Sequence, residues 1–262
     1  MSLGKSSLIA IVTIAAMTLA LHYLFSSING YLAILWDIIV LSLSISYHNL
    51  QNEFSVFCDA VGAGDDKQAD EILSKWNFHE QYMEAKNGNL FFAVSYLISR
   101  WHRGVFSIIF WFIFFPSVAG AFFYFLVVHV LEKQVLQDGE AEGVTILKKI
   151  LRILDWVPER LVVLTMAIAG NFNNVVSCYK SQKHLRSKME NGLITLTTLG
   201  ALGLRFDVKE GQEKNNDDPD NIMSVGAGLE IESDSLCKIQ NFLWRITILW
   251  IIIMGICSFV LS

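Results

Sequence analysis

Residues 144–173, VTILKKILRILDWVPERLVVLTMAIAGNFN, decide the fold that the sequence predicts. In the first half of this segment, apolar residues recur with the spacing of one helical face. Three basic residues fall on the opposite face: Lys148, Lys149 and Arg152. Pro158 cannot continue this helix but suits the first turn of a new one. The segment therefore predicts a cationic helix along a membrane surface, a break at residues 155–158, and a second helix that enters the membrane.

The composition is typical of an integral membrane protein. The chain has 262 residues, of which 53% are hydrophobic, and its mean hydropathy is +0.44. Several apolar runs approach the ~20 residues that cross a bilayer. The net charge of −5 is unevenly distributed, since residues 100–188 are net basic and residues 207–234 mostly acidic. A nucleic-acid partner is not indicated, because the basic residues are scattered among apolar segments. Membrane lipids are the expected partners.

The predicted fold is an all-α integral membrane protein built from helical hairpins, with a re-entrant segment and a C-terminal transmembrane helix. Pro116 lies beside small residues in the apolar run 105–130, so this run either kinks or dips into the membrane and returns. Basic residues on both sides of the run favour the re-entrant form. We expect five parts: an N-terminal transmembrane hairpin (1–47), a cytoplasmic helical segment (48–103), a core with the re-entrant segment and the DWVPxRL turn (104–205), an acidic mobile loop (206–238) and a transmembrane helix (239–262).

Six residues are candidates for ligand binding: Arg100, His102, Arg103, Asp155, Arg160 and Asn171. Arg100 and Arg103 are three positions apart, so their guanidinium groups either clamp a phosphate or lipid headgroup or anchor a helix at the interface. His102 either shuttles protons near neutral pH or is passive.

The remaining candidates also have two interpretations. Asp155 and Arg160 flank Pro158, where they either position a ligand or pair with one another to stabilise the turn. Asn171 either caps the end of a helix or lines a polar cavity. Asp37 lies within the second apolar run, where it either faces the protein interior with a function or lies at the interface.

No catalytic or metal site is predicted from motifs. The four cysteines share no metal-ligand spacing, so neither a metal site nor a disulfide is expected: Cys58, Cys178, Cys237 and Cys257. No Ser-His-Asp order and no phosphate-binding glycine loop occurs in the sequence. The motifs therefore identify no nucleophile and no cofactor.

The motif Asp155-Trp156-Val157-Pro158-x-Arg160-Leu161 resembles the hallmark of the CobD/CbiB/AmpE family of bacterial inner-membrane proteins. The resemblance continues through AGNF at 169–172 and GALGLR at 200–205. Upstream it includes FWF at 110–112, Pro116, and Ala119-Gly120-Ala121-x-x-Tyr124. HRxVF at 102–106 is most similar to the proteobacterial CobD/CbiB-like members. The resemblance covers most of the chain from about residue 90 onward. It implies a multi-pass protein of the bacterial inner membrane, with the N-terminus and the long loops in the cytoplasm.

What the resemblance implies about function divides in two. CobD and CbiB act in cobalamin biosynthesis, joining an aminoalcohol phosphate to adenosylcobyric acid through an amide. AmpE is associated with signalling for β-lactamase induction. Synthase-type members carry acidic and amide side chains around these motifs. The corresponding positions here hold Ser95, Ser99, Arg100, Arg103, Val128 and Leu131.

Because ATP-driven amide formation needs carboxylates that hold magnesium, the first expectation is a catalytically degenerate protein without a cofactor. Such a protein would act in regulation or complex assembly, as AmpE does. The alternative is an adenosylcobinamide-phosphate synthase, an amide ligase using a corrinoid and Mg-ATP with relocated carboxylates at Asp37, Glu84 or Asp155. A third hypothesis is a structural subunit of a larger membrane complex, with a membrane-protein partner or a second copy against residues 110–125.

Overall fold

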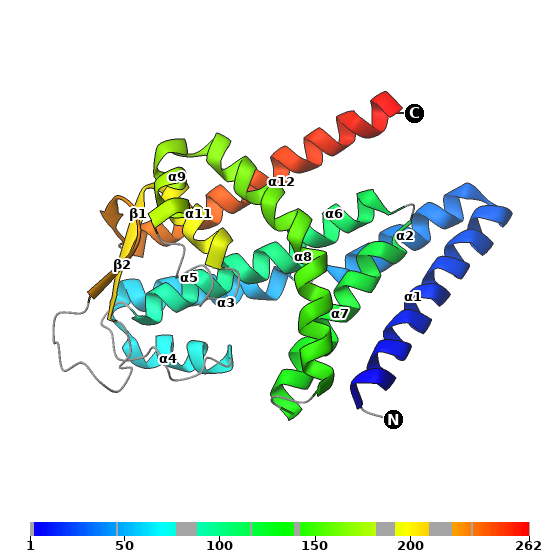
Figure 1. The fold of residues 1–262 in the computed structure, drawn as a ribbon, viewed down its shortest axis with the longest axis horizontal. Helices are drawn as coiled ribbons and strands as arrows, with labels where there is room; N and C mark the ends of the chain where they lie inside the picture. Colours follow the sequence, from blue (N-terminus) through cyan, green and yellow to red (C-terminus); the bar gives the residue numbers. More distant parts are fainter. Residues whose placement is uncertain are drawn as a thin grey trace. The chain divides into compact units, whose positions relative to one another are not determined.

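The computed structural model describes residues 3–45, 47–76, 88–115, 117–138, 142–181, 192–209, 222–231 and 233–261. Most of these residues are helical, which confirms the predicted helical class (Figure 1). The chain forms two compact units, each of which combines two stretches of sequence. Unit 1 contains Met1–Tyr47 and Trp101–Arg160, and unit 2 contains His48–Arg100 and Leu161–Ser262.

A helical hairpin begins unit 1, as the sequence predicts. Helix α1 (Leu3–Ile28) is followed directly by α2 (Gly30–Ser44), and the two pack against each other and against α7 (Ala119–Asp138). Asn29 forms the turn, because its side-chain oxygen accepts a hydrogen bond of 2.9 Å from the Tyr31 amide at the start of α2. The side chain of Asn29 therefore caps the N-terminus of α2.

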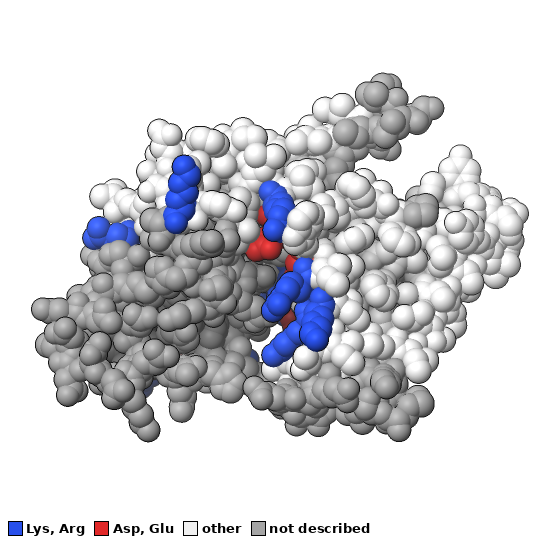
Figure 2. Space-filling view, viewed as in Figure 1, with Lys and Arg blue, Asp and Glu red and all other residues white. Residues whose placement is uncertain are grey.

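The outer faces of α1 and α2 are apolar and exposed. Among the described residues, one helix is long and apolar enough to cross a membrane, namely α1 over Ser7–Ile28. Large hydrophobic side chains on both helices are exposed, including Met17, Leu24, Ile34 and Leu43. Figure 2 shows no acidic or basic side chains over this hairpin on the face in view. Such a surface is unusual in water and suits contact with lipid or another protein.

The apolar run 105–130 forms separate helices rather than one kinked span. A π-helical turn, η2 (His102–Phe106), leads into α6 (Ser107–Phe114), which ends where Phe115 becomes extended. Helix α7 starts at Ala119 and packs against α6. Whether this pair enters a membrane stays a prediction.

Helix α8 (Glu142–Ala169) passes through Pro158 without a break, so the predicted turn at residues 155–158 is wrong. A proline inside a helix removes its own N–H donor from the helical ladder and crowds the carbonyl one turn before it, at a total cost of roughly 3 kcal/mol. Buried apolar side chains both before and after Pro158 favour continued helix: Leu147, Leu151, Val162 and Met166. Tertiary packing thus outweighs the local preference of proline.

Unit 2 begins with two amphipathic helices, which lie in the segment 48–103 that the sequence predicts to be helical. They are α3 (Tyr47–Ala63) and α4 (Asp66–Lys75), separated at Gly64 and Asp65. Their buried residues include the apolar positions that are helically spaced in the sequence: Phe54, Phe57, Ala69, Ile72 and Leu73. Helix α5 (Gly88–Trp101) follows, and its Tyr96 ring stacks on Trp76 at 4.9 Å between centroids.

The rest of unit 2 contains a small sheet, which the sequence did not predict. The strands β1 (Leu204–Lys209), β2 (Ile222–Gly226) and β3 (Leu229–Glu230) lie in the order β2-β1-β3. β1 is antiparallel to β2 and parallel to β3. Within the predicted acidic loop (206–238), residues 206–209, 222–226 and 229–230 are therefore strand and residues 233–238 belong to a helix, while residues 210–221 lie outside the described residues. The helices of this part are α9 (Phe172–Ser181), α11 (Gly192–Leu202) and α12 (Ser233–Leu261).

Candidate functional site

A buried polar cluster in unit 1 brings together three of the six predicted site residues. His102 and Arg103 come from the π-turn η2, and Asp155 comes from α8. Tyr124 of α7 and Ser107, the first residue of α6, complete the cluster. π-Helical turns are rare and are often found at functional sites, which makes η2 the most unusual backbone feature near these side chains.

Asp155 is the centre of this cluster. The Tyr124 hydroxyl donates a 2.5 Å hydrogen bond to Oδ1 of Asp155, and Nε of Arg103 lies 3.5 Å from Oδ2. Asp155 is 6% exposed and Tyr124 is fully buried. Because a buried carboxyl group is costly unless it is paired, the Tyr124 hydroxyl and the Arg103 guanidinium offset the cost of burying Asp155. Both of its oxygens have protein partners.

His102 has no exposed surface and is uncharged at neutral pH. Its Nε2 lies 3.4 Å from the Ser107 hydroxyl, and its ring stacks on that of Phe106. Burial lowers the pKa of His102 to about 4, although the negative charge of Asp155 acts in the opposite direction. Nδ1 has no hydrogen-bond partner among the described residues. His102 therefore differs from a surface histidine that titrates near pH 6.5.

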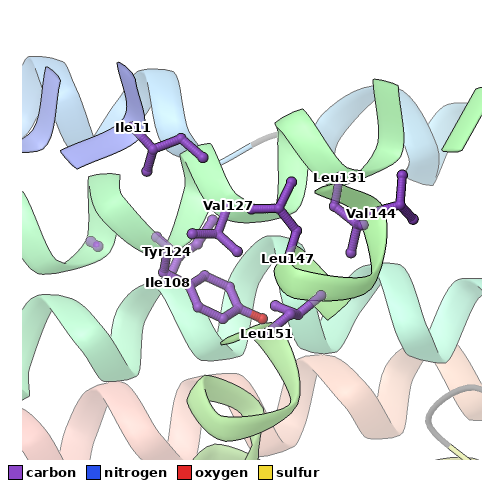
Figure 3. Close-up of a cluster of buried hydrophobic side chains, with 9 residues drawn as sticks. Ile11, Ile108, Tyr124, Val127, Leu131, Val144, Leu147 and Leu151 are labelled. Carbon is purple, nitrogen blue, oxygen red and sulfur yellow. The ribbon is translucent and has the colours of Figure 1, made fainter. Parts of the chain in front are cut away.

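Apolar side chains enclose one side of the cluster (Figure 3). The phenol of Tyr124 lies among buried aliphatic residues, and its hydroxyl is the polar atom of this group. The group joins α1, α6, α7 and α8: Ile11, Ile108, Ala121, Tyr124, Val127, Leu131, Val144, Leu147 and Leu151. The polar contacts of Asp155 are consequently formed next to a water-excluding core, where hydrogen bonds are strong and unpaired groups costly.

The other three predicted site residues have different contacts. The Arg100 guanidinium lies over the Tyr96 ring, 5.9 Å from its centroid, whereas Arg103 pairs with Asp155. The two arginines thus have different neighbours, and whether they clamp a phosphate or lipid headgroup or anchor a helix at the interface stays a prediction. The prediction that Arg100 and Arg103 point to one side took the helix to be a regular α-helix. The π-turn that begins directly after Trp101 changes the angle between successive side chains.

Arg160 and Asn171 have local structural contacts. Arg160 donates a 2.8 Å hydrogen bond to the Trp156 carbonyl, and its guanidinium lies 4.0 Å from the centroid of that indole ring. It does not form the predicted pair with Asp155. The Asn171 side chain accepts a 3.2 Å hydrogen bond from the Asn174 amide, so it caps the start of α9 rather than the end of α8.

Tyr124 and Ser107 were missed as site residues. Tyr124 belongs to the GAxxY motif at 120–124, and a tyrosine inside an apolar helical run needs a hydrogen-bond partner when buried. That requirement was the signal that could have identified it. Ser107 carries no comparable signal, since serines are frequent at such positions.

A second polar pair lies in the α1–α2 hairpin. Nδ1 of His22 is 2.9 Å from Oδ1 of Asp37, and each side chain is 17% exposed. Asp37 therefore faces a partner on α1, which agrees with the interpretation that it points toward the protein. The pair is chemically separate from the cluster around Asp155.

The residues around Asp155 do not fit an Mg-ATP site. Such a site needs carboxylate oxygens that are available to magnesium, whereas both oxygens of Asp155 contact protein donors. Among the described residues, no three His, Cys, Asp or Glu side chains are grouped as metal ligands. Glu84, another carboxylate considered for the ligase, lies outside the described residues.

The cluster pairs the buried carboxyl group of Asp155 with a guanidinium and a phenol, and places the neutral imidazole of His102 beside them. Comparison with known proteins does not extend this description: no family model matches the chain, and no match was found among curated proteins or solved structures.

Proposed function

We propose that this chain is a helical membrane protein of the CobD/CbiB/AmpE kind that acts in regulation or complex assembly rather than in amide ligation. The proposal rests mainly on the contacts made by Asp155, the first residue of the DWVPxRL motif. Its carboxylate is bonded to Tyr124 and paired with Arg103, so the most distinctive motif of the chain serves to hold α7, α8 and η2 together.

Membrane residence is supported by the α1–α2 hairpin. The candidate span in α1 is followed by a second apolar helix, and their outward side chains are exposed hydrophobics. Exposed isoleucines also continue along the second half of α12, at Ile248, Ile251, Ile252 and Ile256. A lipid environment would cover these surfaces. We place the protein in the bacterial inner membrane as a multi-pass protein with a cytoplasmic N-terminus.

The proposed loss of ligase chemistry is supported by two positions where synthase-type members carry polar residues. Leu131 is buried in the apolar group around Tyr124, and Val128 packs against that group. Carboxylate or amide side chains at these positions would have to be desolvated inside a hydrocarbon environment. These positions therefore contribute to the core of unit 1.

Complementation tests the proposal. The gene is expressed in a bacterium that lacks its adenosylcobinamide-phosphate synthase, and growth is measured without supplied cobalamin. An authentic synthase expressed to the same level in the membrane fraction is the positive control. We expect no growth with this chain, and growth equal to the control would overturn the proposal.

An amide ligase with relocated carboxylates is the second candidate, because Asp155 and Arg103 do lie together beside His102. This arrangement brings an acid and a cation to one place, as phosphoryl chemistry requires. It predicts that the chain complements the mutant and that Asp155→Asn abolishes growth while membrane levels of the protein are maintained. Growth of the Asp155→Asn strain would reject a catalytic carboxylate at this position.

A structural subunit of a larger complex is the third candidate. The end of α6 exposes three consecutive apolar residues, Ile113, Phe114 and Phe115, which a membrane-protein partner or a second copy could cover. Purification in mild detergent followed by size analysis tests this possibility. A defined larger assembly that Phe114→Ser disperses would support it, and a monodisperse monomer would contradict it.

A further inference from the structure

We propose that the outward face of α8 binds the headgroups of anionic phospholipids. We call this face the basic stripe and define it by five residues: Lys148, Lys149, Arg152, Trp156 and Arg160. The inference rests on the membrane residence proposed above and adds to it a lipid class and the residues that recognise it.

The geometry of α8 makes these residues one continuous face. Between Thr145 and Arg160, exposed and buried positions alternate with the period of an α-helix. The exposed positions are Thr145, Lys148, Lys149, Arg152, Ile153, Trp156, Val157 and Arg160. Lys148, Arg152, Trp156 and Arg160 follow one another at intervals of four, so they form a row along the helix.

The row is strongly basic on its exposed side. Of the acidic residues between Thr145 and Arg160, Asp155 is buried in the polar cluster and Glu159 is half-buried. Figure 2 shows basic side chains gathered over α8, with a smaller amount of acidic surface beside them. Each basic residue near an anionic membrane surface contributes a factor of roughly five in binding. Four such residues therefore favour an anionic over a neutral surface strongly.

Trp156 and Arg160 identify the surface as a lipid interface. The guanidinium of Arg160 is held over the Trp156 ring at 4.0 Å and bonded to the Trp156 carbonyl. This arrangement orients a fork of N–H donors, which matches the oxygens of a phosphate. Trp156 is 55% exposed, and tryptophan side chains are enriched at the headgroup level of membranes.

Exposed apolar side chains beside the row favour a membrane over a soluble anion. Ile153 is 74% exposed, and Val157 is also exposed on the same side of the helix. A free phosphate or an acidic peptide would leave these side chains in water. A phospholipid surface accepts them next to its acyl chains while its phosphates meet the basic groups, which is how amphipathic helices bind at interfaces.

The test uses the full-length chain purified in an uncharged detergent. Its thermal unfolding and its retention of added lipid are measured with phosphatidylglycerol and with phosphatidylcholine, at low and high salt. The stripe variant carries Lys148→Gln, Lys149→Gln, Arg152→Gln and Arg160→Gln. The control variant makes the same change in charge at four other exposed lysines: Lys67, Lys75, Lys180 and Lys238.

We expect wild type and the control variant to retain phosphatidylglycerol selectively and in a salt-sensitive manner. The stripe variant should lose selectivity by at least tenfold. A second variant, Lys148→Arg with Lys149→Arg, should bind as wild type does, since it keeps the charge. Equal binding of the two lipids by wild type, or unchanged selectivity in the stripe variant, would overturn the proposal.

Two further arms distinguish the source of the anion. Inorganic phosphate and polyglutamate are offered in place of lipid. If either one binds to the stripe as tightly as phosphatidylglycerol does, the site recognises a soluble anion or an acidic peptide and the lipid proposal fails.

Failure of this inference is distinguishable from failure of the proposed function. Membrane residence is measured separately, by carbonate-resistant fractionation of the expressed protein. The stripe variant should remain in the membrane fraction because α1 and α2 are unchanged. If wild type is itself soluble, membrane residence fails whatever the lipid assay shows. If wild type is in the membrane but shows no lipid selectivity, only the stripe is disproved.

Discussion

The Tyr124 hydroxyl and the Asp155 carboxylate, 31 positions apart in sequence, are joined by a 2.5 Å hydrogen bond. It links α7 to α8 at the edge of the buried apolar group. Tyr124→Phe keeps the ring and removes the donor, so we expect a loss of about 1–3 kcal/mol of stability from the under-bonded carboxylate. Thermal unfolding in mild detergent measures this change. Tyr23→Phe, at an exposed position of α1, is the matched control and should unfold as wild type does.

Substituting Asp155 alone should reduce stability more than substituting Asp155 and Arg103 together. Asp155→Asn removes the negative charge that lies 3.5 Å from Nε of Arg103, a side chain that is 15% exposed, and we expect a loss of about 3 kcal/mol. Adding Arg103→Met to that variant should restore part of the stability, because the positive charge beside position 155 is then removed as well. A double variant that is as unstable as the sum of the two single variants would show that the pair is not coupled.

His102 should make the protein less stable in acid. Its pKa is lowered to about 4 by burial, while an unfolded histidine has a pKa near 6.5. The unfolded chain therefore binds a proton first as the pH falls, and stability is lost between about pH 6.5 and pH 4. At pH 5 the expected loss from this group is about 2 kcal/mol relative to pH 7.

His102→Gln tests this prediction, since glutamine does not titrate. Unfolding temperatures of wild type and variant are compared at pH 7 and pH 5. The difference between the two proteins should shift in favour of the variant at the lower pH. Parallel pH profiles would mean that His102 takes up its proton as readily in the folded as in the unfolded protein.

The His22–Asp37 pair should stabilise the α1–α2 hairpin. The two side chains are 2.9 Å apart and mostly enclosed, so a double-mutant cycle with His22→Gln and Asp37→Asn should give a coupling of about 1 kcal/mol. The Lys75–Glu71 pair of α4 is a useful comparison, because its side chains are 63% and 70% exposed. Exposed pairs contribute about 0.5 kcal/mol or less. Equal coupling energies in the two cycles would contradict a special role for the hairpin pair.

Gly228 should be essential for the sheet of unit 2. Its φ of +125° is unfavourable for other residues, and an added Cβ would lie 2.1 Å from the Gly203 carbonyl oxygen. Gly228→Ala should therefore increase hydrogen exchange across β1, β2 and β3. Gly62→Ala in α3 meets no atom within 4 Å and should be neutral or stabilising. Unchanged exchange in the Gly228→Ala sheet would show that the turn can adapt.

Local sequence patterns predicted which residues form helices more accurately than they predicted which helices contact one another. The spacing of Phe54 and Phe57 identified the buried face of α3, and the apolar runs at the N-terminus identified the α1–α2 hairpin. The sheet was missed although β1, LRFDVK, alternates apolar and charged residues as a strand does, because this run of six residues follows α11 directly and opens the acidic region that was predicted to be a loop.

The candidate site was only partly predictable for a related reason. His102, Arg103 and Asp155 were recognised as chemically suitable, but their assembly depends on how α7 and α8 pack and on the π-turn. Neither feature follows from local sequence. The predicted helix break at residues 155–158 was wrong for the same reason, since packing along α8 outweighed the local tendency of Pro158 to end a helix.

The π-turn also has a consequence for how this segment tolerates changes in length. A π-helical turn closes its ring over one more residue than an α-helical turn, and one residue corresponds to about 100° of rotation. A deletion of Gly104 would allow regular helix to run from α5 into α6, but would turn His102 and Arg103 by about that angle away from Asp155. The shortened chain should thus gain a regular helical backbone and lose the Arg103–Asp155 ion pair. This outcome is expected if the extra residue of the π-turn is an insertion that is retained because it turns His102 and Arg103 toward Asp155.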